Sequence, residues 1–274
     1  MSHLRSVSLK PGSDEQFPFT VPAIASLPTL SFDRPITFLV GENGSGKSTL
    51  LEGMALAAML PTVGRVAAAD DETLEPQRAL AARLKLVWNH RTRRGFFLRA
   101  EDFFGFTRQL ARLRDELRGR LAELEPEYEG RSAYAKRLAM GPALASLAEL
   151  ERRYGADLDA NSHGESFLKL FQARFVPGGL YLLDEPEAPL SPQSQIGLLA
   201  MVLEMVKQDA QFIVATHSPI LLACPGAGIF SFDESPVCEA EFDSLDHVTL
   251  TRDFLANPQR FLRHLGAARD GDPR

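Results

Sequence analysis

The residues whose types and spacing could do chemistry begin with a glycine-rich stretch. It follows the apolar run Ile36–Val40 and reads Gly41-Glu42-Asn43-Gly44-Ser45-Gly46-Lys47-Ser48-Thr49. This matches G-x-x-x-x-G-K-[ST], in which a curled backbone points several N–H groups at one anion, helped by the positive end of the following helix. We expect Lys47 to neutralise the β- and γ-phosphates of ATP and the Ser48 hydroxyl to ligate Mg²⁺. A plain Gly/Ser-rich turn is the alternative.

Acidic residues and a histidine follow two later apolar runs. Asp184 and Glu185 come directly after residues 180–183, and His217 follows residues 212–215. Ligands bind at the carboxyl ends of parallel strands, so Asp184 is expected to hold Mg²⁺, directly or through water. Glu185 is placed to take a proton from the water that attacks the γ-phosphate, and His217 to donate to that phosphate or orient Glu185. Taken singly, each acid could be a surface turn and the histidine a structural one.

These residues need a parallel sheet to bring them together. Alternation predicts a strand at residues 3–9, and the remaining strands are expected at residues 30–32, 36–40, 180–183 and 212–215. A helix is expected over residues 50–60, and another starts at Ser191-Pro192 and runs to about residue 208. We therefore expect an α/β fold whose central sheet is mainly parallel.

Residues 84–88 and 95–99 are interpreted as a hairpin joined by a basic turn, Asn89 to Arg94. Three arginines of that turn are the best candidates for a DNA phosphate contact, although a solvated loop tip explains them equally: Arg91, Arg93 and Arg94.

Two amphipathic runs predict an inserted helical subdomain at about residues 105–160. Leucines recur at steps of three and four from residue 110 to residue 124, and Pro126 is expected to end that helix. A second helix is expected over residues 142–154. Residues 11–28 are expected to form an irregular N-terminal arm. Its Phe17 or Phe19 either stacks on a nucleotide base or packs as a hydrophobic side chain under a loop. We expect a surface excursion at residues 62–79 and a helical tail at residues 246–265, interrupted near residue 257.

The length of 274 residues allows one large α/β domain or two small ones, and we favour a single domain over residues 1–274. The chain is 45% hydrophobic and 24% charged, with a net charge of −6, which argues against a protein that coats nucleic acid with its whole surface. Its two cysteines fit neither a zinc site nor a disulfide framework. No signal peptide or membrane-spanning run is visible, so a cytoplasmic protein is expected.

Together the motifs resemble those of the ABC-type ATPase superfamily. The resemblance adds a signature-like segment, Asn161 to Ser166, in which Ser162 and Gly164 match the family pattern, whereas His163 and Asn161 depart from it. It implies a P-loop NTPase fold with an N-terminal antiparallel portion, and an ATP-dependent homodimer that sandwiches two ATP molecules. The family's loop glutamine has no clear match, and Glu101 lies near its place.

The loop after the acids resembles chromosome-maintenance and recombination-repair ATPases and bacterial stand-alone predicted AAA/ABC-type ATPases. The favoured function is a cytoplasmic ATPase that drives or switches a partner, in DNA repair or defence. Two alternatives stay open: the nucleotide-binding subunit of a membrane transporter, and an ATP-gated interaction module with little turnover. The sequence does not name the partner.

Overall fold

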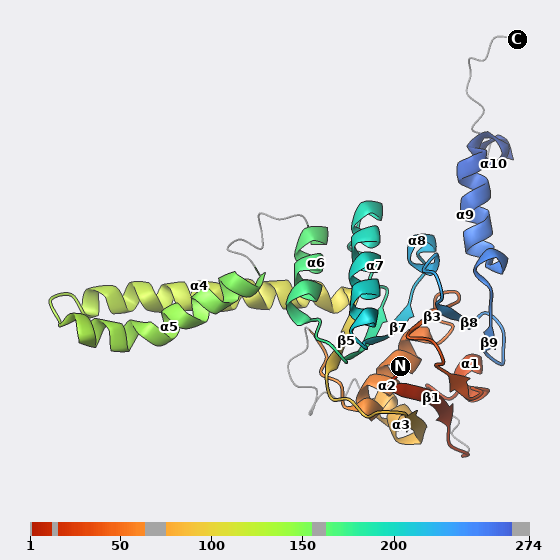
Figure 1. The fold of residues 1–274 in the computed structure, drawn as a ribbon, viewed down its shortest axis with the longest axis horizontal. Helices are drawn as coiled ribbons and strands as arrows, with labels where there is room; N and C mark the ends of the chain where they lie inside the picture. The colour runs from red at the N-terminus through yellow and green to blue at the C-terminus, as the bar shows by residue number, and fades with distance from the viewer. Residues whose placement is uncertain (1, 13–15, 64–74, 155–162, 265–274) are drawn as a thin grey trace, which may run out of the picture.

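A six-stranded sheet forms the centre of the molecule (Figure 1). The computed structural model describes residues 2–12, 16–63, 75–154 and 163–264. In spatial order the strands are β5 (Gly95–Arg99), β6 (Leu180–Asp184), β7 (Gln211–Ala215), β3 (Ile36–Val40), β8 (Gly228–Ser231) and β9 (Cys238–Glu239). The first five run parallel, and only β9 pairs antiparallel with its neighbour. The predicted α/β fold with a mainly parallel sheet is confirmed.

The sheet is buried on both faces because its side chains alternate between two cores. In β7, Phe212 and Val214 face one core, whereas Ile213 and Ala215 face the other. The first core is covered by α6 (His163–Arg174), α7 (Pro192–Lys207) and α8 (Pro219–Leu222). The second is covered by α2 (Lys47–Ala58), α3 (Glu75–Arg83) and a small antiparallel sheet (Figure 1). Burial on both faces explains why these strands read as continuous apolar runs.

The small sheet has the order β2-β1-β4 and supplies the expected N-terminal antiparallel portion. Its strands are β1 (Leu4–Leu9), β2 (Leu30–Ser31) and β4 (Leu84–Trp88). The fully buried side chain of Gln211, at the start of β7, joins the two sheets. Its Oε1 accepts hydrogen bonds from the backbone N–H groups of His3 and Leu4, and its Nε2 donates to the Leu4 carbonyl, all at 2.8–2.9 Å.

The predicted hairpin of residues 84–88 and 95–99 is wrong. β4 pairs with β1 in the small sheet, whereas β5 pairs parallel with β6 in the large one. The reason is burial: β5 places Phe96, Phe97 and Leu98 in the two cores, while most of β4 is only half-buried. Gly95 makes the pairing feasible, because a Cβ there would lie 1.8 Å from the Leu180 carbonyl oxygen.

Two long helices pack side by side into an arm that extends away from the sheet (Figure 1). They are α4 (Ala100–Glu127) and α5 (Ala133–Tyr154). The predicted leucine stripe is largely confirmed, since Leu110 is buried and Leu117, Leu121 and Leu124 are half-buried, but Leu113 is exposed. The helical insert therefore exists, while its standing as a subdomain of a single domain stays a prediction.

Several predicted helix boundaries are wrong. Pro126 does not end α4, which continues one residue further, because a proline in the last turn removes only one hydrogen bond. The second helix of the arm begins at residue 133 rather than 142, where the Ser132 hydroxyl accepts from the Ala135 N–H. Residues 75–79 of the expected surface excursion lie in α3, whose Leu80 is fully buried; residues 64–74 fall outside the described residues.

The remaining ends of the chain agree more closely with expectation. The N-terminal arm is irregular apart from α1 (Pro22–Ala25), and the tail forms η2 (Phe242–Ser244), α9 (Asp246–Ala256) and α10 (Pro258–His264) with the predicted break between the last two helices. Phe19 is half-buried under the guanidinium of Arg83 and packs against the second core, whereas Phe17 is half-exposed. Within the described ranges, none of the helices combines the length and apolar character that a bilayer crossing needs.

Candidate nucleotide-binding and catalytic site

The glycine-rich loop connects the buried strand β3 to helix α2, as predicted. Gly41, Gly44 and Gly46 adopt φ values of 140°, 84° and 106°, which side chains with a Cβ rarely reach. A Cβ at Gly41 would also lie 3.0 Å from both Phe232 Cβ and Ser45 Oγ. The sequence needs glycine at these positions to turn the loop tightly over the end of the strand.

Lys47 is the first residue of α2 and is buried inside the loop. Its ammonium donates to the carbonyl of Gly41 and, at 2.8 Å, to that of Glu42. Burial lowers the pKa of Lys47, and the nearby carboxylates of Glu185 and Asp184 oppose the shift. The cation therefore lies near the predicted base Glu185 and the predicted metal ligand Asp184, although 137 positions separate it from Asp184 in sequence.

Ser48 and Asp184 come together as the motif spacing predicts. Ser48 Oγ donates to Asp184 Oδ1 at 3.0 Å, linking the start of α2 to the end of β6. Burial raises the pKa of Asp184 to about 6, opposed by the Ser48 hydrogen bond and the Arg99 guanidinium. One hydroxyl and one carboxylate at this spacing are oxygen ligands of the type that Mg²⁺ prefers alongside substrate phosphates. The donor set thus fits the expected ion.

Glu185 and His217 extend from neighbouring strands toward each other. β6 and β7 are adjacent and parallel, and His217 Nε2 lies 3.9 Å from Glu185 Oε1. Glu185 has the uncommon φ of 49°, held by its N–H donating to the Ala215 carbonyl at 2.9 Å. Burial and the Lys47 cation lower the pKa of His217, which favours the neutral form of its ring.

Glu187 supports His217 and was missed by the sequence reasoning. Its Oε1 accepts from the His217 N–H at 2.7 Å, and burial raises its pKa. This bond ties the loop after Glu185 to the loop that carries the histidine. The only sequence signal was its position two residues after the acidic pair.

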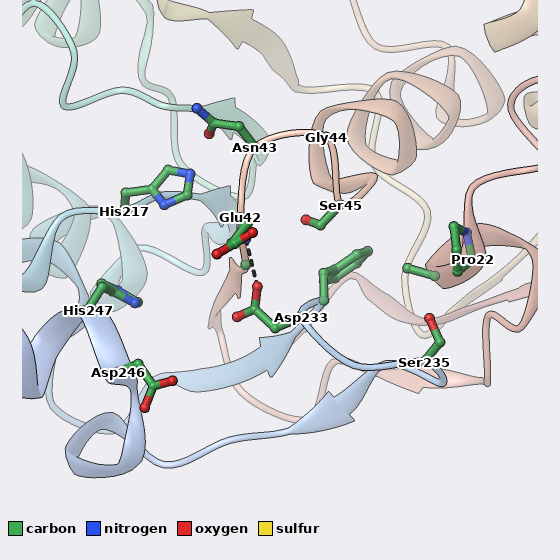
Figure 2. A pocket seen from close by; sticks show the side chains of 13 residues that line it. Pro22, Glu42, Asn43, Gly44, Ser45, His217, Asp233, Ser235, Asp246 and His247 are labelled. Atoms are coloured by element: carbon green, nitrogen blue, oxygen red, sulfur yellow. Dashed lines mark hydrogen bonds between the residues drawn. The ribbon is translucent and has the colours of Figure 1, made fainter.

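A cavity of about 680 Å³ opens beside the loop. Figure 2 shows the rings of His217 and His247 on one side of it, facing Glu42 and Asp233. The two imidazole centroids are 6.3 Å apart, and burial lowers the pKa of His247. Asp233 Oδ1 accepts from the Glu42 N–H at 2.7 Å, which braces the loop from the end of β8. Sequence reasoning missed both His247 and Asp233, although an acid after an apolar strand was the signal used for Asp184.

A second cavity, of about 510 Å³, is lined by Ser48 and Asp184. Its wall includes Glu101 and Arg99, whose Nη1 lies 3.1 Å from Glu101 Oε1. Glu101 is thus near the predicted metal position, but its replacement of the family's loop glutamine stays a prediction. Arg99 carried no motif signal and was also missed.

The other predicted residues lie elsewhere. Ser162 is outside the described residues, and Gly164 is in the first turn of α6, so their role at a dimer contact stays a prediction. The basic turn precedes β5, so it lies at the end of the sheet opposite the glycine-rich loop, which follows β3. Arg91, Arg93 and Arg94 are exposed there, and Arg94 Nη1 donates to the Pro177 carbonyl at 3.3 Å.

Two family comparisons identify the class of protein. Residues 23–124 match a family described as "AAA domain". Residues 74–223, more than half of the chain, match the family described as "AAA domain, putative AbiEii toxin, Type IV TA system". The chain belongs to this AAA-domain family, and the expected resemblance to AAA/ABC-type ATPases is confirmed at the level of the AAA domain.

Solved structures with similar chains include two Smc heads and a transporter cassette. The Smc head of Pyrococcus furiosus, solved with the C-terminal domain of ScpA, is 14% identical, with 96% of this chain and 99% of that chain covered and a TM-score of 0.45. The SMC head of Thermotoga maritima is 14% identical, with 88% of this chain and 100% of that chain covered and a TM-score of 0.43. A nucleotide-free ATP-binding cassette from an ABC transporter is 16% identical, with 94% of this chain and 97% of that chain covered and a TM-score of 0.45. A search of curated proteins found no match.

Proposed function

We propose that this protein binds ATP with Mg²⁺ and hydrolyses it. One observation carries the proposal: Lys47, Ser48, Asp184, Glu185 and His217 come from three neighbouring strand ends and meet at one edge of the sheet. Membership of an AAA-domain family supports the same conclusion.

The loop and its lysine perform the binding. Backbone N–H groups of the glycine-rich loop and the α2 N-terminus bind the phosphates, and the Lys47 ammonium neutralises their charge. Ser48 Oγ and Asp184 Oδ1, 3.0 Å apart, would hold Mg²⁺. When bound, the ion supplies charge neutralisation at the phosphate oxygens.

Glu185 supplies the base. Its carboxylate takes a proton from the attacking water, and its half-exposed position leaves room for that water. His217 Nε2, 3.9 Å away, orients the carboxylate. The left-handed backbone at Glu185 is consistent with a catalytic role, because strained conformations persist mainly where the surrounding structure and function require them.

Hydrolysis is proposed to occur in an ATP-dependent homodimer that switches a partner in the cytoplasm. Gly164, at the start of α6, and Ser162 just before it would act across that dimer. The family description, which names a toxin of a type IV toxin–antitoxin system, favours a defence role over DNA repair. Residues 1–274 are proposed to form one ATPase domain with the α4–α5 arm inserted. A DNA contact through the arginines of residues 89–94 would lie far from the nucleotide.

The Glu185→Gln variant tests this function. Turnover should fall about 100-fold or more, because the amide cannot accept the proton, while ATP affinity stays near that of wild type. Glu204→Gln, an exposed glutamate paired with Lys207, is the control and should hydrolyse ATP normally. Light scattering with saturating ATP should show the Glu185→Gln dimer. Full turnover in Glu185→Gln contradicts the assigned base, and a strictly monomeric variant contradicts the dimer.

A further inference from the structure

Arg99 is held beside Asp184 by the register of the sheet. β5 and β6 pair in parallel, and Arg99 and Asp184 are direct partners at the last position of the two strands. The arginine is also the residue from which α4 begins. Strand pairing therefore fixes the backbone of Arg99 next to the predicted metal position, and its guanidinium carries a positive charge at any pH at which the protein is folded.

The guanidinium lies among three carboxylates from three different elements. Its Nη2 is 2.6 Å from Glu52 Oε1 on α2, its Nη1 is 3.1 Å from Glu101 Oε1 on α4, and its Nε is 3.8 Å from Asp184 Oδ2. The side chains of Glu52 and Asp184 are 7% and 8% exposed, and that of Arg99 is 19% exposed. Two of these ion pairs are therefore shielded from water, where charges interact more strongly.

The contact with Asp184 is the weakest of the three. Arg99 Nε is buried and makes no hydrogen bond to any described residue, and its separation from Asp184 is longer than a hydrogen bond. Asp184 thus divides its oxygens, with Oδ1 accepting from Ser48 and Oδ2 facing Arg99. A divalent cation on Asp184 would be repelled by the guanidinium. The guanidinium could nevertheless move away from Asp184 and keep its ion pairs with Glu52 and Glu101.

We propose that Arg99 is a positioning residue that neutralises Asp184 until a divalent cation arrives, and that cation and guanidinium then exchange at this carboxylate. The inference rests on the proposed function only in placing Mg²⁺ at Ser48 and Asp184. Its consequence is that the nucleotide-free site resists a cation on its own and accepts one when phosphates add their negative charge.

The test measures Mn²⁺ binding to nucleotide-free protein by the paramagnetic resonance signal of free Mn²⁺. The double variant Glu52→Gln/Arg99→Met removes the guanidinium together with its nearest buried partner, so that Glu52 is not left as an unpaired charge. We expect it to bind Mn²⁺ about tenfold or more tightly than wild type. Adding Asp184→Asn should remove the gain, and Arg99→Lys, which keeps the positive charge, should bind as weakly as wild type.

Equal Mn²⁺ affinity in the double variant and wild type overturns the proposal, as does a gain that survives Asp184→Asn. If this double variant does not fold, Glu52→Gln/Arg99→Gln, which keeps a polar side chain at position 99, gives the same comparison against wild type. Because no nucleotide is present, the result is independent of ATP hydrolysis. A Mn²⁺ gain in a protein that never hydrolyses ATP would overturn the proposed function alone.

Discussion

Ser48 Oγ lies 3.0 Å from Asp184 Oδ1, although 136 positions separate the two residues in the chain. The hydroxyl lies in the first turn of α2 and the carboxylate is on the last residue of β6, so the bond joins the glycine-rich loop and its helix to the end of the acidic strand. Neither element could form this site alone. The site therefore depends on the packing of α2 under the sheet, and substitutions that disturb the loop or the sheet test it independently.

Gly46→Ala should impair nucleotide binding more than Gly44→Ala. Both glycines have positive φ, which costs alanine about 1–2 kcal/mol. Only at Gly46 would the new methyl group meet a neighbour, Val21 Cγ1 at 3.0 Å, whereas nothing lies within 4 Å at Gly44. Titration with a fluorescent ATP analogue should show an affinity about tenfold weaker for Gly46→Ala than for Gly44→Ala. Equal losses of nucleotide affinity in the two variants would mean that the loop does not depend on its contact with Val21.

His217→Ala should lower kcat about 100-fold and leave KM nearly unchanged. The reason is the loss of the group 3.9 Å from Glu185 that orients the base. His247→Ala is the matched control, because its ring lines the same cavity and its centroid lies 6.3 Å from that of His217. Steady-state ATPase assays should find this control within about threefold of wild type. Similar losses in both variants would assign the effect to the cavity wall rather than to His217.

Asp184→Asn should stabilise the metal-free protein at neutral pH. Burial raises the folded-state pKa of Asp184 from 3.8 to about 6, so the unfolded chain ionises first as pH rises. Stability is therefore lost between about pH 4 and pH 6 and stays low above that range, by an amount on the order of 3 kcal/mol. Thermal melts in a chelating buffer should show the variant's advantage over wild type growing across that window. An advantage independent of pH would contradict the assigned ionisation.

Phe212→Ala should destabilise the fold by about 3–5 kcal/mol. The ring is fully buried in β7 and stacks on Tyr181 at 4.9 Å, with Phe175 at 5.4 Å. Denaturant unfolding would measure the loss. The half-exposed Phe17 provides the comparison, since Phe17→Ala should change stability by less than about 0.5 kcal/mol. A small effect at Phe212 would show that the aromatic cluster relaxes around the hole.

The sequence was informative where local patterns coincide with the physics of the site. The loop glycines are needed for positive φ, and the run before Asp184 is apolar because β6 is buried on both faces. The assumption that residues 212–215 form a strand next to β6 was enough to predict that His217 lies near Glu185. Each of these inferences used a residue type whose chemistry or conformation leaves few alternatives.

Pairing between distant segments was harder to predict. Residues 84–88 and 95–99 look like a hairpin because they are close in sequence, yet the uninterrupted apolar run Phe96-Phe97-Leu98 was itself a sign of a strand buried on both faces. Arg99 lies beside Asp184 because β5 pairs with β6, so no local sequence motif identified it. His247 arrives on α9 from the end of the chain, and only the folded structure shows that it faces the phosphate loop.

The arm formed by α4 and α5 begins one residue after Arg99, whose guanidinium lies 3.8 Å from Asp184. A straight helix of the length of α4, 28 residues, spans about 42 Å, so a tilt of about 5° at its base displaces its far end by about 4 Å. A small tilt at this end of α4, beside the proposed nucleotide site, would therefore be amplified along the arm into a displacement that another molecule could detect.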